Sequence, residues 1–311
     1  MLHLTKMDIK FICKWFSIGF SDKIFRLGRG FENKVYLLKT KNQYFVIKIY
    51  DLSKVSEEYL NLKQKITTKL IKEGISIPKE IKNKRGGFFL RNKHSYIEVQ
   101  KYVFGKSPKN ISKKIAHDLG FIHGKIDKVL FKRRFSQNEL NSMNNTHLLL
   151  AQNNFIPAKL FQDYLNIQKE LEFKKEIRVG VINGDFNAWN TLINKKKIVA
   201  ILDWSDLHKD YLILDPAIFI TGNLISESKI QLNKIKEYLR GYQKSICLNK
   251  DEKESFKLIL EYAQLRNVFW LASVLEGRKS RTMDLKSKLK TAIQKYQILK
   301  KLNDNRLRNY A

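Results

Sequence analysis

The sequence contains few of the residues that mark several common protein classes. Its two cysteines, Cys13 and Cys247, lie far apart and fit neither a disulfide framework nor a zinc site. The 4 Pro and 14 Gly are too few for a collagen-like chain or a proline-rich linker. No apolar run reaches the roughly 18 residues that span a membrane, and residues 1–15 lack the pattern of a signal peptide. We therefore expect a soluble, cytoplasmic protein with no membrane partner.

Negatively charged residues are also scarce. There are 30 Asp and Glu residues against 60 Lys and Arg residues, which gives a formal net charge of +30. A charge of this size can indicate nucleic-acid binding. Most of the excess is lysine, however, spread along the chain with Lys195–Lys197 as a tight cluster, whereas phosphate recognition favours the bidentate guanidinium of arginine. We therefore interpret the charge as a solvated basic surface and expect no nucleic-acid partner.

The first third of the chain has the pattern of a small sheet. The overall composition, 43% hydrophobic and 12% aromatic, is that of a folded protein. Residue patterns predict three strands at residues 24–29, 34–40 and 44–50. They also predict a helix at 53–73, which Gly74 terminates, and a further hairpin at 82–103. We therefore predict an N-terminal lobe over residues 1–104, built as an antiparallel sheet with one main helix.

Helical periodicity dominates the remainder of the chain. We expect helices at 111–122, within 136–175 and from 226 onward, with three short strands between them at 178–182, 191–194 and 198–202. These elements predict a mostly helical C-terminal lobe over residues 105–311. The whole chain is therefore predicted to have an α+β fold.

A lysine interrupts the most apolar predicted strand. The ammonium group of Lys48 must either bind a partner or extend to the rim of the sheet. Glu57 and Glu58 open the following helix, and either could pair with it. Kinases use a strand lysine and a helix glutamate in this way to hold the α and β phosphates of ATP. Gly28 and Gly30, at the bend between the first two strands, could cover the phosphates with backbone N–H groups.

Two aspartates and an asparagine surround the later strands. Asp185 and Asn190 lie in the loop at 183–190, and Asp203 follows the strand at 198–202. Phosphoryl transfer needs a carboxylate that accepts the proton of the substrate hydroxyl, and an amide and a carboxylate that hold Mg²⁺. A polar turn followed by a helix-capping Asp is the alternative interpretation of the same residues.

The order of these motifs resembles the aminoglycoside phosphotransferase superfamily over about residues 24–276. The closest match is to the family's His-Gly-Asp, Asn, Asp-Trp and Asp-Pro series, here Asn183-Gly184-Asp185, Asn190, Asp203-Trp204 and Asp215-Pro216. The resemblance implies a bilobal protein-kinase-like fold with ATP and Mg²⁺ as cofactors. Asn183 departs from the family pattern, so that an amide must brace the catalytic loop where the family usually has a histidine.

The resemblance also implies a role for each matching residue. Asp185 is expected to be the catalytic base and Asn190 and Asp203 the metal ligands. Lys48 is expected to bind phosphate, with Glu58 as its helix partner.

Further roles follow from the same resemblance. Gly28 and Gly30 belong to the expected phosphate loop, and the backbone of Lys101, Tyr102 and Val103 is expected to bind the adenine edge. Asp215 would act as a structural brace, and His123 as a packing residue.

These expectations predict transfer of the γ-phosphoryl group of ATP to the hydroxyl of a small metabolite. A polycationic aminoglycoside needs a dense acidic patch, and the C-terminal lobe is rich in lysine, so we expect a sugar, an amino alcohol or a homoserine-like acceptor. A catalytically silent nucleotide-binding pseudokinase and a basic kinase that acts on protein or binds nucleic acid remain as alternatives. Trp189 and Trp204 flank the loop, either as core residues or, less favoured, as stacking surfaces for a substrate ring.

Overall fold

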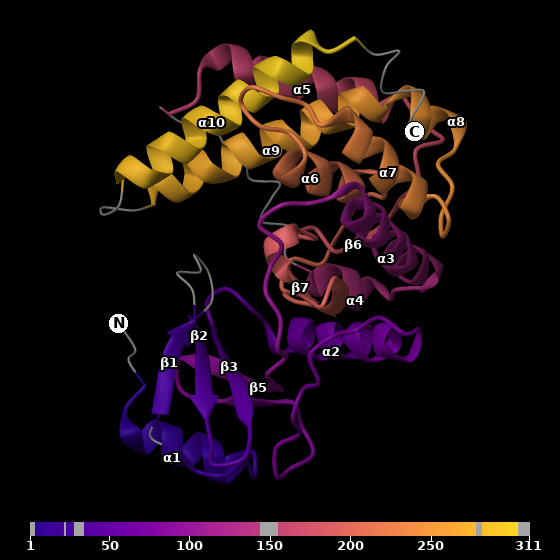
Figure 1. Cartoon of the computed structure of the whole chain (residues 1–311). Coiled ribbons are helices and arrows are strands. Elements are labelled where there is room, and N and C mark those ends of the chain that lie inside the picture. Colours follow the sequence, from indigo (N-terminus) through magenta and orange to yellow (C-terminus); the bar gives the residue numbers. More distant parts are fainter. Residues whose placement is uncertain (1–3, 22, 28–33, 144–154, 278–281, 304–311) are drawn as a thin grey trace. The chain divides into compact units, whose positions relative to one another are not determined.

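The computed structural model describes residues 4–21, 23–27, 34–143, 155–277 and 282–303 (Figure 1). The chain divides into two compact units, Met1–Lys106 with Val199–Leu202, and Ser107–Ile198 with Asp203–Ala311. The first unit contains an antiparallel sheet and the second is mostly helical. This architecture confirms the predicted α+β fold class. None of the described helices is both long enough and apolar enough to cross a membrane.

The first unit is built on a five-stranded antiparallel sheet in the order β1-β2-β3-β5-β4. Its strands are β1 (Lys23–Leu27), β2 (Lys34–Lys39), β3 (Tyr44–Asp51), β4 (Phe89–Arg91) and β5 (Ser95–Lys101). Two helices accompany it, α1 (Lys6–Trp15) and α2 (Glu57–Lys72). Because side chains alternate between the two faces of a strand, each face of this sheet carries its own set of residues.

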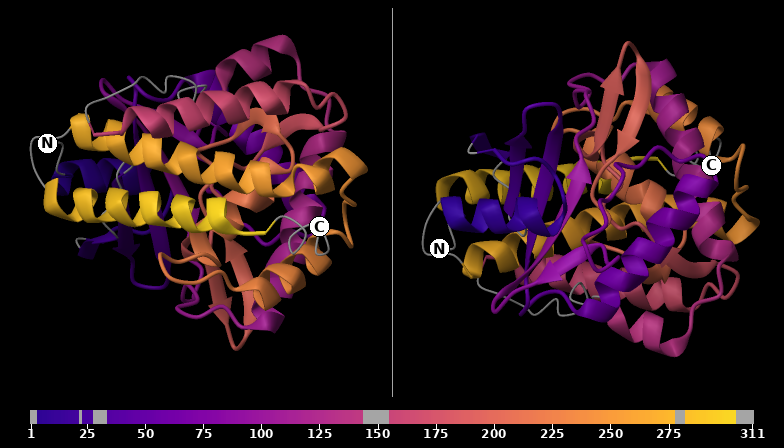
Figure 2. Two further views of the ribbon diagram at one scale, coloured as in Figure 1. Left: turned by 90° about the horizontal axis from the view of Figure 1, so that it is seen from above. Right: turned by 90° about the horizontal axis from the view of Figure 1, so that it is seen from below.

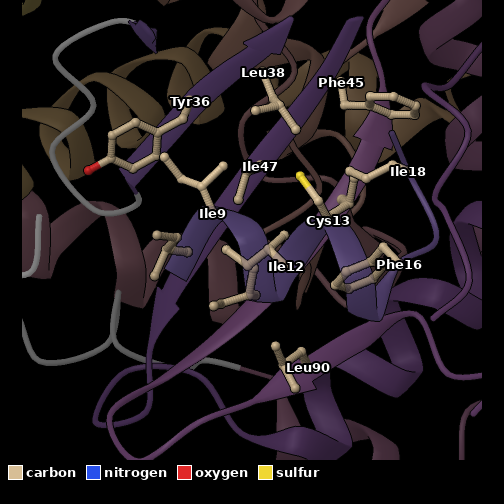
Figure 3. Close-up of a cluster of buried hydrophobic side chains, with 13 residues drawn as sticks. Ile9, Ile12, Cys13, Phe16, Ile18, Tyr36, Leu38, Phe45, Ile47 and Leu90 are labelled. Carbon is tan, nitrogen blue, oxygen red and sulfur yellow. The ribbon is translucent and has the colours of Figure 1, made fainter. Parts of the chain in front are cut away.

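One face of the sheet packs on α1. Ile9, Ile12 and Cys13 from the helix meet Leu38 and Ile47 from the central strands in one buried apolar cluster (Figure 3). The spacing of the helix residues places them on a single stripe, which explains why α1 buries this side. The helix begins with a capping box, in which the side chains and backbone N–H groups of Thr5 and Asp8 bond reciprocally. This helix was not predicted from the sequence.

The other face of the sheet contacts α2. Ser56 caps the start of this helix by accepting a hydrogen bond from the Tyr59 N–H. The helix stops before Gly74, which has a φ of 81° that only glycine adopts readily. Its side chains Tyr59, Leu62, Ile66 and Leu70 are buried. Lys63, also buried, extends from α2 to Tyr50 and Glu98 on the sheet.

The second unit contains most of the helices. They are α3 (Lys113–Lys132), α4 (Gln137–Ser142), α5 (Ala158–Glu172), α6 (Leu214–Asn223), α7 (Leu232–Tyr242), α8 (Lys250–Glu254), α9 (Phe256–Glu276) and α10 (Thr282–Lys301). Figure 2 (left) shows α9 between α5 and α10, and α9 contacts both. Two short sheets interrupt the helices along the chain. In one, β6 (Val179–Ile182) pairs antiparallel with β9 (His208–Tyr211), and in the other β7 (Thr191–Asn194) pairs with β8 (Lys197–Ile201).

Glycines allow α3 and α7 to pack in close contact. A Cβ atom on Gly120 would lie 1.9 Å from the carbonyl oxygen of Tyr238, and one on Gly241 would lie 2.1 Å from that of His117. Both distances are far inside van der Waals contact, so only glycine fits at either position. This close approach positions α3, which carries residues that lie beneath the catalytic loop.

Candidate active site

The loop at residues 183–190, named the catalytic loop for its predicted role, follows β6, and contacts to its backbone fix its conformation. Gly184 has a φ of 77°, and a Cβ at this position would lie 2.5 Å from the carbonyl oxygen of Asp206. The carboxylate of Asp215, in the first turn of α6, accepts hydrogen bonds from the N–H groups of Asn183 at 2.7 Å and Gly184 at 2.9 Å. The loop conformation therefore depends on a glycine and on a buried carboxylate.

Asp215 belongs to a buried polar cluster with two residues of α3. Nε2 of His123, on α3, lies 3.1 Å from the Asp215 carboxylate, and the His123 ring stacks on Phe186 of the catalytic loop with 4.0 Å between centroids. Asp127, one turn further along α3, accepts a hydrogen bond of 2.6 Å from the Tyr242 hydroxyl. The side chains of His123, Asp127 and Asp215 are fully buried. They are close enough to hold a metal ion, but both oxygens of Asp215 already accept backbone N–H groups, so we assign this cluster to bracing.

The two carboxyl groups of this cluster have opposite pKa shifts. Burial acts to raise the pKa of Asp215, but His123 and the two backbone N–H donors outweigh it and hold the pKa below its usual value. Burial raises the pKa of Asp127 well above its usual value, and the charge of Asp215 adds to the shift. Asp215 is therefore the ionised partner, and Asp127 favours its protonated form.

Asp185 and Asn190 lie in direct contact. One oxygen of the Asp185 carboxylate accepts a hydrogen bond of 2.7 Å from Nδ2 of Asn190, and the other accepts one from Nδ2 of Asn187. Burial raises the pKa of Asp185 well above its usual value, and the negative charges of Asp206 and Asp203 raise it further. The structure therefore brings the predicted base Asp185 into contact with the predicted metal ligand Asn190. Asp203, the other predicted ligand, lies near enough for its charge to act on Asp185.

The backbone of Asp203 is strained. Its φ is 53°, in the left-handed region that non-glycine residues rarely adopt, and such strain is concentrated at functional sites. The Ser205 hydroxyl donates a hydrogen bond of 2.8 Å to the Asp203 carboxylate. Mg²⁺ prefers carboxylate and amide oxygens, and a bound cation would oppose the repulsion that raises the pKa of Asp185. The residues present therefore fit a divalent metal ion.

The predicted nucleotide-binding residues lie in the first unit. Lys48 is a half-buried residue of β3 and stands opposite Glu98 of β5 in the strand register. Glu58 is exposed in the first turn of α2. Gly28 and Gly30 lie outside the described residues.

The predicted adenine-binding segment begins at the end of β5. The N–H groups of Lys101 and Tyr102 donate to the carbonyl oxygens of Lys79 and Tyr44, at 2.8 and 3.1 Å. A backbone hydrogen bond from either of these two residues to adenine must therefore use its carbonyl oxygen. For Val103, both the N–H group and the carbonyl oxygen stay predicted binding groups.

A buried charge cluster beside Lys48 was missed by the sequence analysis. Lys63 of α2 forms ion pairs with Glu98 and with Glu80, the latter at 3.4 Å, and these side chains are 9% exposed or less. Burial alone would lower the pKa of Lys63, but the carboxylates hold it well above its usual value. Burial raises the pKa of Glu80, while the charges of Lys63 and Lys48 oppose that shift. The available signal was a lysine on the apolar stripe of a predicted helix.

The two tryptophans beside the loop differ in burial. Trp204 is 4% exposed and belongs to the core, whereas Trp189 is 55% exposed. The Ser107 hydroxyl donates to the Trp189 carbonyl oxygen at 2.9 Å. The core interpretation therefore fits Trp204, and Trp189 presents an aromatic surface to solvent.

Most of the chain matches a known protein family. The model of the phosphotransferase enzyme family matches residues 23–254. The chain belongs to this family. Homoserine kinase of Zymomonas mobilis is 23% identical to this phosphotransferase over 247 residues, which cover 76% of each chain.

Solved structures share the fold. An amicoumacin kinase in complex with AMP-PNP and Ca²⁺ has a TM-score of 0.76 and 17% identity, with 96% of this chain and 94% of the other covered. A microcompartment-associated aminopropanol kinase has a TM-score of 0.72 and 14% identity, with 93% and 94% covered. Spectinomycin phosphotransferase in complex with ADP and spectinomycin has a TM-score of 0.69 and 14% identity, with 97% and 100% covered.

Proposed function

We propose that this phosphotransferase transfers the γ-phosphoryl group of ATP to the hydroxyl of a small metabolite. The observation that carries the proposal is the contact of Asp185 with Asn190, beside the charge of Asp203, in a loop that Asp215 fixes through backbone N–H groups. The similar homoserine and aminopropanol kinases and the lysine-rich composition favour a homoserine-like acceptor or another small amino alcohol, with a sugar as the remaining candidate.

Each residue has a defined part in the proposed reaction. Asn190 and Asp203 would hold Mg²⁺, and the bound ion would neutralise charge on the phosphate oxygens. Asp185 orients the acceptor hydroxyl and takes its proton as the oxygen attacks the γ-phosphorus. The bond from that phosphorus to the bridging oxygen breaks, and ADP leaves.

The nucleotide is assigned to residues of the first unit. Lys48 binds the α and β phosphates, and Glu58 supports it from α2. Gly28 and Gly30 are assigned to phosphate binding from the sequence motif alone, since they lie outside the described residues. The backbone at residues 101–103 binds adenine.

The test measures ADP release by the full chain with Mg²⁺ and ATP against a panel of hydroxyl compounds. The panel contains homoserine, aminopropanol, choline, simple sugars and an aminoglycoside. We expect release with a small amino alcohol and none with the aminoglycoside. ATP binding without turnover on any compound would instead indicate a pseudokinase.

The matched variant is Asp185→Ala. Nucleotide binding should be largely retained, because the phosphates are assigned to other residues, whereas transfer should be abolished. A variant that keeps transfer within severalfold of the parent would remove Asp185 from the role of base.

A further inference from the structure

An arginine of α9 contacts β9, the strand that pairs with β6 ahead of the catalytic loop. Arg266 forms an ion pair with Asp210 of β9, and the two side chains are only 11% and 14% exposed. Its second terminal nitrogen, Nη2, lies 3.2 Å from Nε2 of His208, also on β9. Arg266 thus contacts His208 and Asp210, which are alternate residues of this short strand and so share one of its faces.

These contacts determine the protonation state of His208. A guanidinium group has only donors, so Nε2 of His208 must accept the hydrogen bond from Arg266. Nδ1 of His208 lies 2.7 Å from the carbonyl oxygen of Asp206, which can only accept, so Nδ1 must carry the proton. These two contacts assign His208 the neutral form with its proton on Nδ1. The Asp210 carboxylate lies 3.7 Å from Nε2, too far for a hydrogen bond, and is itself paired with Arg266. Burial lowers the pKa of His208, the charge of Arg266 lowers it further, and Asp206 and Asp210 oppose the shift.

The Asp206 carbonyl group in turn limits the position of the catalytic loop. A Cβ on Gly184 would lie 2.5 Å from the Asp206 oxygen and 2.6 Å from Cε1 of His208. The backbone of Gly184 therefore packs directly on both groups, and Asp185 follows it in the chain. A shift of His208 or of the Asp206 carbonyl would move the residue that precedes the proposed base.

We propose that Arg266 and His208 are positioning residues, which fix the Asp206 backbone against Gly184 and thereby place Asp185 for phosphoryl transfer. This inference rests on the proposed function. Among the described residues, Arg266, Asp206 and Asp210 are charged groups that act on His208. A second proton on His208 would point an N–H at the Arg266 donor, so acidification should break this link.

The first experiment reads the imidazole state directly. The full chain, with ¹⁵N-labelled histidine, is examined by NMR at neutral pH, and His208→Asn identifies the signal among the six histidines. We expect a neutral ring with the proton on Nδ1. A ring protonated on Nε2, or an imidazolium, would overturn the proposal independently of any enzymatic activity.

The second experiment measures kcat, the KM for ATP and the pH profile of kcat. We expect Arg266→Met to lower kcat roughly tenfold to a hundredfold, the cost of a small misplacement of a reacting group, with the KM for ATP unchanged within about twofold. The acidic limb of the profile should move to higher pH, because the charge that lowers the pKa of His208 is gone. Neither effect is expected for Arg240→Met, a matched variant on α7 whose side chain is 63% exposed.

His208→Asn and His208→Leu cover the case in which Arg266→Met does not fold. The asparagine amide can still donate to the Asp206 carbonyl oxygen, so His208→Asn should have a higher kcat than His208→Leu. Because asparagine does not titrate, the acidic limb of the kcat profile of His208→Asn should not move when Arg266 is also replaced. Equal kcat values for asparagine, leucine and the parent would overturn the inference. A parent that transfers phosphoryl groups to no acceptor would instead reject the proposed function.

Discussion

Replacing Asp215 with asparagine tests the buried carboxylate that holds the catalytic loop. The side chain is fully buried and accepts two backbone N–H groups, while Nε2 of His123 lies 3.1 Å away. An asparagine offers a single acceptor oxygen, and its NH₂ group would face another donor. Asp215→Asn therefore removes at least one charge-assisted hydrogen bond and leaves a buried N–H group without an acceptor.

The size of the effect follows from these contacts. A hydrogen bond to a charged group contributes about 1.5–3 kcal/mol, and a buried donor left without an acceptor costs roughly 1–3 kcal/mol. We expect Asp215→Asn to lower the free energy of unfolding by about 4 kcal/mol, which corresponds to a fall in Tm of roughly 8–16 °C for a unit of this size. The phosphoryl transfer rate should fall with it, because the loop that carries Asp185 loses its anchor.

Asp127→Asn is the matched control in the same buried cluster. Asp127 favours its protonated form because burial and the charge of Asp215 raise its pKa, and an asparagine amide resembles that form. Its oxygen can still accept from the Tyr242 hydroxyl, as Asp127 does at 2.6 Å. We expect Asp127→Asn to be as stable as the parent at pH 7, or more stable.

Urea unfolding at several pH values gives the sign of each contribution. The pKa of Asp215 is lowered in the folded state, so its stabilisation is present above the ordinary pKa of about 3.9 and is lost as the pH falls through the folded-state pKa. The difference in free energy of unfolding between the parent and Asp215→Asn should therefore become smaller at acidic pH. The pKa of Asp127 is raised, so the parent loses stability as the pH rises through the acidic range and Asp127→Asn does not. Equal destabilisation by both variants at pH 7 would refute the assignment of charge.

Three further changes have definite expected outcomes. Gly120→Ala should lower the free energy of unfolding by several kcal/mol in chemical denaturation, because its Cβ would meet the Tyr238 carbonyl oxygen at 1.9 Å; a change near zero would show that α3 and α7 separate easily. Glu98→Gln should cost about 3–5 kcal/mol in the same assay, since it weakens the pairing of buried Lys63. Trp189→Ala should leave Tm unchanged, as expected for a side chain that is 55% exposed, and should raise the KM for the acceptor if the ring stacks on it.

The elements that could be predicted from the sequence are those with a clear periodic pattern of apolar residues. The strand with Lys48 and the helix with the stripe Tyr59, Leu62, Ile66 and Leu70 are present in the structure. β9 was missed because His208–Tyr211 contains no apolar alternation, and the strand exists through backbone pairing with β6. α1 was missed although Ile9, Ile12 and Cys13 have helical spacing and Thr5 is a suitable cap.

The same distinction applies to the candidate site. The contact of Asp185 with Asn190 spans five positions and was accessible from the motif. The contact of Arg266 with His208 spans 58 positions, and that of Lys63 with Glu98 spans 35. Such pairs depend on how separate elements pack, which residue spacing does not specify. The roles given to these residues all stay predictions: those of Asp185, Asn190 and Asp203 as well as those of Lys48, Glu58, Gly28, Gly30 and residues 101–103.

The bracing of the catalytic loop explains how asparagine can replace the histidine that the family pattern has at position 183. Asp215 accepts the backbone N–H groups of Asn183 and Gly184, which every non-proline residue supplies. The Asn183 side chain adds one bond, in which Oδ1 accepts the Asp185 N–H at 3.1 Å, while its Nδ2 has no hydrogen-bond partner within the described part of the chain. A histidine that reaches Asp215 is supplied by α3, as His123. Asp215 therefore still fixes the loop although position 183 carries an asparagine and no histidine. This departure from the family pattern does not argue against catalysis.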